Sequence, residues 1–276
     1  MQLPEDYVQQ QVALALAEDI GTGDVTAQLI PQNKLAKAKI ISREHAILCG
    51  TLWVNHVFKQ LDSEINIEWH YKDGDAIQPD LELCHIHGSA RHLLSGERTA
   101  LNFLQTLSAT ATQANEYVKA VMGTGCRILD TRKTIPGLRL AQKYAVRCGG
   151  AHNHRTGLFD MILIKENHIS AAGTIQAAVE AARQLSPTIP IEVEVENLVQ
   201  LQQALTARVD RILLDNMDIV TLKQAVELCA KRIPLEASGG VDLQTVRKIA
   251  ETGVDYISIG SITKHIRAID LSMRFI

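Results

Sequence analysis

The sequence has no C-x-x-C pair, no long apolar run and no marked excess of charge of either sign. Its five cysteines are odd in number and widely spaced, at Cys49, Cys84, Cys126, Cys148 and Cys229. This pattern favours reduced thiols in the cytoplasm over a disulfide framework, a zinc motif or a redox motif. No apolar run approaches the roughly 18 residues of a membrane span, and the N-terminus lacks the regions of a signal peptide. We therefore expect a cytoplasmic protein that is neither exported nor inserted in a membrane.

Nucleotide-binding motifs and a basic field are also missing. Neither G-x-G-x-x-G nor G-x-x-x-x-G-K-[ST] is present, so the sequence gives no support to a dinucleotide fold or a P-loop. The net charge of -3 excludes the overall basic field that draws proteins to nucleic acid or anionic lipid. The 276 residues, 46% of them hydrophobic, suffice for one large domain or two ordinary ones.

What the chain does have is a dense group of cations in its middle. Arg132, Lys133, Arg155 and Lys165 each lie at or near the end of an apolar run, and His154 adds an imidazole. Arginine forks match carboxylate or phosphate oxygens, although a single arginine is more often a surface salt-bridge partner. Because barrel active sites lie at the carboxyl ends of strands, the group predicts a site for a small anion.

From about Gly125 onward, short apolar runs alternate with helical segments. The expected strands are residues 127–130, 161–165, 191–196, 211–215 and 256–260, with 235–238 as a weaker sixth. Asp218 and Asp242 are expected N-caps of two of the helices. Alternation of this kind predicts a parallel sheet, either closed as a barrel or open and doubly wound.

The run from Ile191 to Glu196 favours the barrel. Period-2 alternation places Glu192, Glu194 and Glu196 on one face, and helices cover the outer face of a parallel barrel, so these glutamates would point to the lumen or its mouth. An antiparallel edge strand with one wet face is the alternative.

Residues 1–108 have a different pattern. Strands are expected at 35–41, 65–69 and 83–87, with a turn at 73–75. A separate α+β domain at 1–108 is thus predicted, followed by a barrel domain at 109–276, with a helix over 91–121 linking them.

Other residues are candidates for binding a phosphorylated sugar. Ser238-Gly239-Gly240 and Ile259-Gly260-Ser261 follow strands and could present backbone N–H groups to phosphate, although ligand-free turns use the same residues. Glu194 and Asp215 could hold Mg²⁺ or ribose hydroxyls, or form internal ion pairs with Lys165 or Arg132. His85 and His87 lack a third ligand nearby, which disfavours zinc.

Several strings in order resemble the quinolinate phosphoribosyltransferase family, essentially from end to end. They are Gly96–Leu104 (GERTALNFL), Asp130–Arg139 (DTRKTIPGLR), Gly149–Arg155 (GGAHNHR), Ile164–His168 (IKENH), Glu192–Val195 (EVEV), Leu213–Met217 (LLDNM), Glu236–Gly240 (EASGG) and Ser258–Ser261 (SIGS).

The resemblance implies an N-terminal α/β sandwich domain and an incomplete, seven-stranded α/β barrel. It implies a homodimer in which Arg98 reaches the partner's site, and transfer of phosphoribose from phosphoribosyl pyrophosphate to quinolinate with Mg²⁺, in NAD biosynthesis. Quinolinate would be bound by Arg98, Arg132, His154, Arg155 and Lys165. The donor would be bound by Lys133, Glu194, Asp215, Ser238, Gly239, Gly240, Ile259, Gly260 and Ser261, and Thr131 is a further expected substrate-binding residue. Of these, Lys133, Glu194 and Asp215 would act in catalysis, and Glu194 and Asp215 are the candidate metal ligands.

Two rivals stay open on the sequence. One is a paralogue acting on another acidic acceptor, such as the molybdenum-operon proteins that resemble this family. The other is an anion sensor without turnover, although Glu194 and Asp215 would add nothing to a pure anion receptor.

Overall fold

The computed structural model describes residues 3–4 and 6–276, which form two compact units. Unit 1 contains the residues up to Gln113 together with Leu140–Gly150 and His265–Ile276, and unit 2 contains Ala114–Arg139 and Ala151–Lys264. The units are thus interleaved along the chain, and the single boundary between residues 108 and 109 stays a prediction.

Unit 1 is an antiparallel sheet with helices. Its elements are α1 (Tyr7–Ile20), η1 (Ala27–Leu29), β1 (Leu35–Ser42), β2 (Ala46–Ile47), α2 (Thr51–Leu61), β3 (Asn66–Trp69), β4 (Ala76–Ile77), β5 (Glu82–Ser89), the first part of α3 (Ala90–Ala120), α4 (Arg139–Cys148, from Leu140) and β12 (Leu271–Phe275). Within the described residues, the main sheet has the order β12-β1-β5-β3, and every pair in it is antiparallel. The three strands expected from the sequence are confirmed.

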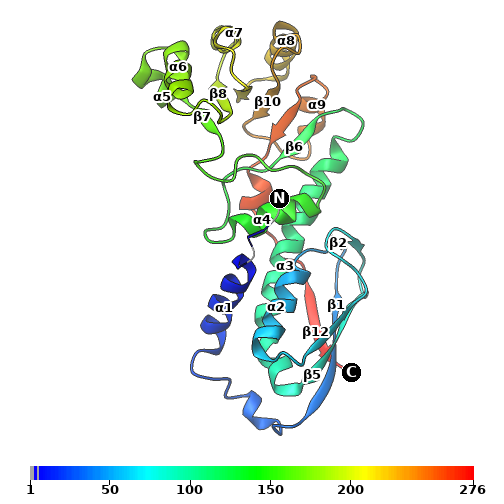
Figure 1. The fold of residues 1–276 in the computed structure, drawn as a ribbon. Coiled ribbons are helices and arrows are strands. Elements are labelled where there is room, and N and C mark those ends of the chain that lie inside the picture. The colour runs from blue at the N-terminus through cyan, green and yellow to red at the C-terminus, as the bar shows by residue number, and fades with distance from the viewer. Residues whose placement is uncertain (1–2, 5) are drawn as a thin grey trace. The chain divides into compact units, whose positions relative to one another are not determined.

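The core of unit 1 is apolar. Trp53, Val57 and Phe58 of α2 are fully buried with Ile40 of β1 and Leu104 of α3. Figure 1 shows α2 and α3 beside β1, β5 and β12. Helix α3 can approach α2 closely because residue 96 is glycine: a Cβ there would lie 2.8 Å from the Phe58 ring.

Unit 2 is the predicted parallel sheet with alternating helices. Its elements are the end of α3, β6 (Arg127–Leu129), β7 (Ile162–Ile164), α5 (Glu166–Ala172), α6 (Ile175–Leu185), β8 (Ile191–Val195), α7 (Leu198–Ala207), β9 (Arg211–Asp215), α8 (Ile219–Cys229), β10 (Leu235–Ser238), α9 (Val246–Ala250), β11 (Tyr256–Ser258) and α10 (Ser261–Lys264). In the described part of the chain the strand order is β6-β11-β10-β9-β8-β7. His152 adds a single parallel bridge to Leu129 of β6.

This order is that of an incomplete barrel. The described residues give it six strands, where the resemblance implied seven, and the bridge at His152 is the one further pairing beside β6. Strands β6 and β11, the first and last of unit 2, are paired within the sheet, and β6 and β7 form its two edges. Strand β8 is parallel to β7 and β9 on its two sides, which rules out the antiparallel edge strand.

Side-chain caps begin several of the barrel helices. Thr174, Asn197 and Asp218 accept hydrogen bonds from backbone N–H groups in the first turns of α6, α7 and α8. The expectation for Asp242 was wrong. Its carboxylate accepts bonds from Gln244 N and Thr245 N in a turn, and α9 begins only at Val246, because aspartate favours such turns as well as caps.

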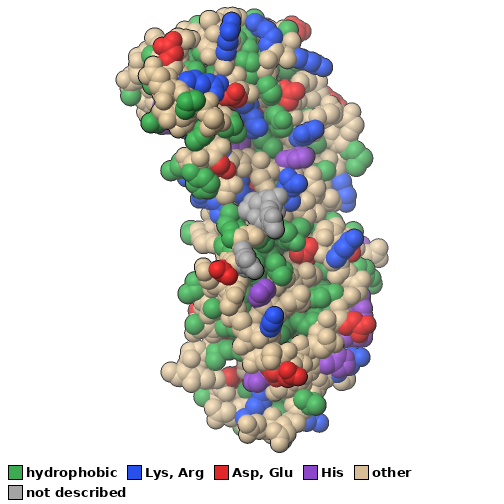
Figure 2. Space-filling model, in the orientation of Figure 1, with side chains coloured by type: hydrophobic (Ala, Val, Ile, Leu, Met, Phe, Trp, Pro, Cys, Tyr) green, Lys and Arg blue, Asp and Glu red, His purple; other side chains and the backbone are tan. Residues whose placement is uncertain are grey.

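On the face in Figure 2, Lys and Arg side chains lie among Asp and Glu side chains. Among the described residues, no helix is long and apolar enough to cross a membrane.

Candidate active site

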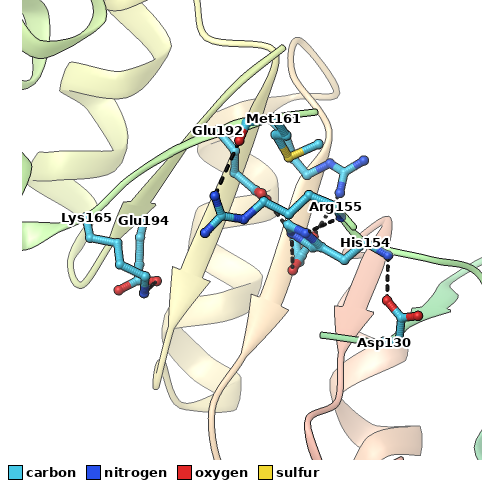
Figure 3. Close-up of polar contacts among 9 residues, drawn as sticks. Asp130, His154, Arg155, Met161, Lys165, Glu192 and Glu194 are labelled. Atoms are coloured by element: carbon cyan, nitrogen blue, oxygen red, sulfur yellow. Dashed lines mark hydrogen bonds and ion pairs between the residues drawn. The ribbon is translucent and has the colours of Figure 1, made fainter. Parts of the chain in front are cut away.

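Strand register brings side chains from distant parts of the sequence to the carboxyl end of the barrel. Ile164 is paired with Val193, so the following residues, Lys165 and Glu194, come side by side and their side chains form an ion pair (Figure 3). Glu194 thus forms the internal ion pair with Lys165 that the sequence left open as an alternative to binding Mg²⁺ or ribose hydroxyls. Leu213 is the sheet partner of Glu194. Asp215, two residues further along β9, lies on the same face of the strand as Leu213.

A pocket of about 320 Å³ lies at this end of unit 2. Its lining residues are Thr131, Arg132, Lys133, His154, Arg155, Leu163, Lys165, Glu194, Leu213, Glu236, Ser238 and Ser258. The four cations predicted from the sequence are therefore brought together in one cavity.

The two arginines form the most cationic part of the wall. Burial, and then the neighbouring charge of Arg132, lowers the pKa of the Arg155 guanidinium. Arg155 donates to the carbonyl of Met161 at 3.3 Å. Within the described residues, the buried Nε of Arg132 has no hydrogen-bond partner. A buried donor of this kind is costly unless a ligand satisfies it, so the wall is suited to an anion.

The turns that contain Gly239 and Gly260 pack closely against residues next to the pocket. A Cβ at Gly260 would lie 2.9 Å from Lys133 Cδ, so the lysine stem packs directly on this glycine. A Cβ at Gly239, whose φ is +101°, would lie 2.1 Å from Asn216 Oδ1. Asp215 is paired with Ser238 in the sheet, and Asn216 N donates to the Ser238 carbonyl. The ends of β9 and β10 thus form one tight surface.

A second group of charged side chains, the inner carboxyl cluster, consists of Glu192, Glu236, His154 and Arg211. His154 Nε2 is 2.9 Å from Glu192 Oε2 and 3.5 Å from Glu236 Oε1, and Arg211 pairs with Glu236 at 3.0 Å. Burial raises the pKa of Glu192 to about 7, and burial followed by the charge of Glu192 raises the pKa of Glu236 to about 7. Glu192 was expected to face the lumen. Glu236, a charged residue inside the buried strand β10, and Arg211, at the start of β9, were not expected in the site.

The remaining predicted residues lie outside the pocket lining. They are Arg98, Asp215, Gly239, Gly240, Ile259, Gly260 and Ser261. Asp215 and the glycines are nonetheless adjacent to lining residues, as the contacts above show. Ile259 is buried, and Ser261 is within 3.2 Å of the Tyr117 hydroxyl. Arg98 is an exposed residue of α3 in unit 1. Glu196, expected on the lumen side, is exposed just beyond the end of β8.

Glu194 and Asp215 are the residues that could hold a metal ion. They stand on the same face of neighbouring strands, and each offers carboxylate oxygens, the ligand type that Mg²⁺ prefers. Neither belongs to a group of three or more candidate metal ligands among the described residues. Two carboxylates suit a Mg²⁺ ion whose shell is completed by water and substrate phosphates, as is usual for this metal.

Fold and pocket together define an α/β-barrel protein with a cationic pocket at the carboxyl ends of its strands. Two family models match the chain: the quinolinate phosphoribosyl transferase N-terminal domain over residues 24–108 and the C-terminal domain over residues 110–274. The chain belongs to the quinolinate phosphoribosyltransferase family.

Individual relatives agree. The chain is 42% identical to the probable nicotinate-nucleotide pyrophosphorylase (carboxylating) of Bacillus subtilis, over 93% of this chain and 89% of the relative. The nicotinate-nucleotide pyrophosphorylase structure from Francisella tularensis is 49% identical with a TM-score of 0.98, covering 100% of this chain and 98% of the other. That from Ehrlichia chaffeensis is 38% identical with a TM-score of 0.94 and full coverage of both chains. The predicted fold class is confirmed.

The fold alone does not select an acceptor. A structure of human nicotinic acid phosphoribosyltransferase shares it with a TM-score of 0.64 at 14% identity, covering 99% of this chain and 74% of that one. The acceptor has to be argued from the residues of the pocket.

Proposed function

We propose that this protein is a quinolinate phosphoribosyltransferase that forms nicotinate mononucleotide, pyrophosphate and carbon dioxide from quinolinate and phosphoribosyl pyrophosphate, in NAD biosynthesis. The observation that carries the proposal is the pocket that joins Arg132, Lys133, Arg155 and Lys165, with a buried guanidinium N–H of Arg132 that has no hydrogen-bond partner among the described residues. Both substrates are polyanions. Family membership supports the same reaction.

The acceptor half of the site would be formed by Arg132, Arg155 and Lys165, with His154 in the wall behind them. Two arginine forks suit the two carboxylates of quinolinate, and holding both fixes the direction in which the ring nitrogen points. Lys165 is held beside the acceptor by its ion pair with Glu194.

The donor half would be formed by Thr131, Lys133, Glu194, Asp215 and the turns at 238–240 and 259–261. In the transfer step the pyridine nitrogen forms a bond to the anomeric carbon of the ribose while the bond from that carbon to pyrophosphate breaks. The sugar passes through a cationic, oxocarbenium-like state, which the carboxylates of Glu194 and Asp215 can stabilise. Lys133 faces the departing pyrophosphate charge. A Mg²⁺ ion held by Glu194, Asp215 and phosphate oxygens would neutralise part of the same charge.

Decarboxylation follows from the first step. Once its nitrogen is alkylated, the pyridine ring becomes an electron sink. The bond between the ring and the adjacent carboxylate then breaks, carbon dioxide leaves, and the electron pair on the ring carbon next to the cationic nitrogen takes up a proton. The bound intermediate supplies its own electron sink, so the reaction chemistry needs no organic cofactor.

We further propose a homodimer in which Arg98 completes the acceptor site of the neighbouring subunit. Arg98 is exposed, it belongs to unit 1, and it does not line the pocket among the described residues of its own chain. A cytoplasmic location stays a prediction.

The direct test incubates the purified protein with quinolinate, phosphoribosyl pyrophosphate and Mg²⁺ and measures nicotinate mononucleotide and carbon dioxide. We expect the two products in equal amounts, and loss of turnover when chelator replaces Mg²⁺. Binding of both substrates without turnover would instead favour the anion sensor, and full activity in chelator would remove the metal from the reaction.

A further inference from the structure

Two of the five cysteines lie side by side in unit 1, and neither lines the pocket of the candidate active site. The sulfur atoms of Cys49 and Cys148 and a carboxylate oxygen of Asp73 all lie within 4.8 Å of one another. Cys49 is fully buried just before α2, and Cys148 is half-buried as the last residue of α4. A single buried cysteine is an ordinary small apolar residue. A second, partly exposed thiol beside it adds a reactive group.

The backbone of Cys49 is held in place by α3. Its N–H donates to Ser108 Oγ at 3.0 Å, and the Ser108 hydroxyl donates to the Cys49 carbonyl at 3.1 Å. The next residue, Gly50, packs directly on the same helix, because a Cβ there would lie 3.3 Å from Leu104 Cα. The Cys49 thiol is therefore presented from a fixed position.

Cys148 lies where α4 ends. Gly149 N donates to the Ala145 carbonyl at 2.9 Å, and the chain then turns at Gly150, whose φ is +88°. The turn at residues 73–75 packs beside this helix end, since a Cβ at Gly74 would lie 3.5 Å from the Cys148 carbonyl oxygen. The last residue of a helix can shift more easily than one in its middle, because helix ends fray. Cys148 is thus the thiol that can move towards its partner.

The third member of the group, Asp73, is already bound. Its Oδ1 accepts from Gly50 N at 3.0 Å and Thr51 N at 3.1 Å, and its Oδ2 accepts from the Tyr144 hydroxyl at 2.9 Å. Structural zinc sites have four ligands, mostly cysteine and histidine. Among the described residues this group offers three, and one of them is a carboxylate that holds three donors. The arrangement favours the chemistry of a thiol pair over that of a metal site.

The two thiols differ in reactivity. The neighbouring Cys49 thiol lowers the pKa of Cys148, whereas burial raises the pKa of Cys49 well above its ordinary value. The thiolate is the form that reacts with oxidants, and access to the sulfur also matters. Cys148 is therefore the thiol that reacts first, and Cys49 is the thiol placed to complete a bond.

We propose that Cys49 and Cys148 form a redox site that a peroxide converts into a reversible disulfide. The thiolate of Cys148 attacks one oxygen of hydrogen peroxide and the O–O bond breaks. The hydroxide that leaves takes up the proton that Cys148 lost and becomes water. The Cys49 sulfur then attacks the sulfur of the Cys148 sulfenic acid, the S–O bond breaks, and a second water leaves with the Cys49 proton.

Two electrons pass from the thiols to the peroxide, and a dithiol reductant returns them. The disulfide would join the residue before Gly50 and α2 to the end of α4. Closing the bond brings the two sulfurs to about 2 Å, which requires rotation of the side chains and a shift of the end of α4. No step involves the pocket, so the inference is independent of the proposed function.

The test treats the reduced wild-type protein with a small excess of hydrogen peroxide in the presence of chelator. Free thiols, counted after denaturation, should fall from five to three, and the intact mass should fall by that of two hydrogen atoms. Peptide mapping should find Cys49 joined to Cys148 within one chain. Dithiothreitol should restore all five thiols.

Three variants test the order of the two steps. Cys148→Ala should form no crosslink and lose thiols at least about tenfold more slowly, because the more reactive thiol is missing. Cys49→Ala should stop at the sulfenic acid of Cys148, which dimedone traps, and Cys49→Ser serves if the alanine variant does not fold. Cys126→Ala is the matched control. Burial raises the pKa of Cys126 to about 12, so its removal should leave the crosslink and its rate unchanged.

Retention of all five thiols, or their loss without the bond between Cys49 and Cys148, would overturn the proposal. A crosslink between two chains would also overturn it, since Cys148 would then react away from Cys49. Wild-type protein that is purified with about one zinc ion per chain, lost in Cys148→Ala, would assign the pair to a metal and overturn it as well. None of these measurements depends on turnover.

Discussion

The interiors of the two units differ in kind. In unit 1 the largest fully buried side chains are apolar except for Lys143, with Trp53 and Phe58 at the centre of the core. In unit 2 the described interior holds the carboxyl groups of Asp130, Glu192 and Glu236 among the apolar strand residues. Apolar burial stabilises a fold, while buried carboxyl groups generally do not.

The difference indicates a division of work. The interior of unit 1 mainly contributes to the free energy of unfolding. The interior of unit 2 holds charged groups in fixed directions around a pocket, at some cost in stability. If this is correct, substitutions in the first interior should change the free energy of unfolding, and substitutions in the second should change activity or its pH dependence. Each prediction below can break or sharpen that contrast.

The largest effect on stability is expected for Trp53→Ala. Trp53 is fully buried, donates to Gln11 at 2.9 Å and packs near the rings of Phe103 and Tyr144. Its truncation should lower the free energy of unfolding by about 3–5 kcal/mol, measured by chemical denaturation. Leu52→Ala, on the same helix but 39% exposed, is the control and should cost far less. Equal losses would contradict the assignment of the core.

Arg132→Ala should leave stability nearly unchanged and remove most activity. A substrate carboxylate left without its charged partner costs roughly 2–5 kcal/mol, which corresponds to a fall of about 30-fold to several thousand-fold in kcat/KM. Arg127→Ala changes an exposed arginine at the start of strand β6 and is the matched control. A variant with near-native kcat/KM would place the acceptor elsewhere.

Mixed dimers test whether unit 1 contributes Arg98 to the partner's pocket. Arg98→Ala and Arg132→Ala should each be nearly inactive as homodimers. A heterodimer would have one site with both changes and one site with neither, so up to about half of the native activity per heterodimer should return. The assay follows turnover after subunit exchange, with exchange confirmed by tagged subunits. Exchange without recovery would show that Arg98 does not act across the interface.

The smallest effect concerns pH and Glu236. Its folded-state pKa, raised to about 7 mainly by burial, lies above the ordinary value of 4.5. Between these values the folded state holds a proton that the unfolded state has lost, so wild-type stability should fall as pH rises from 4.5 to about 7. Glu236→Gln lacks this loss. Its melting temperature relative to wild type should therefore rise with pH over this window.

The control for this series is Glu227→Gln, on the exposed face of α8. Its melting difference from the wild type should not depend on pH. A pH-independent difference for Glu236→Gln would mean that the carboxyl group is not held protonated.

Much of the barrel was predictable because its signals are local. The strand from Ile191 alternates apolar residues with glutamate, the strand from Arg211 contains an apolar run that ends at Asp215, and Asp218 caps its helix as expected. The resemblance of motifs supplied the residues of the site in order. Pairing of Lys165 with Glu194 was one of two readings, and only the register of β7 against β8 decided between them.

What the sequence could not reveal depends on contacts between distant segments. Strand β12 joins the sheet of unit 1 beside β1, more than two hundred positions away, and five residues from Leu271 give no sign of that partner. Glu236 and Arg211 pair across β10 and β9. Cys49 and Cys148 are widely spaced in sequence. Their sulfur atoms and a carboxylate oxygen of Asp73 all lie within 4.8 Å of one another in unit 1, and all five cysteines are free thiols.

The most direct test of the account is the ratio of kcat/KM for quinolinate to that for nicotinate, with phosphoribosyl pyrophosphate and Mg²⁺ held constant. Nicotinate lacks the second carboxylate and would leave a half-buried cation of the pocket without its partner. We predict a ratio of about 100 or more, since a site built for a charged group rejects a ligand without it by a large factor. Comparable values for the two acceptors would contradict the assignment of the cationic pocket to a dicarboxylate.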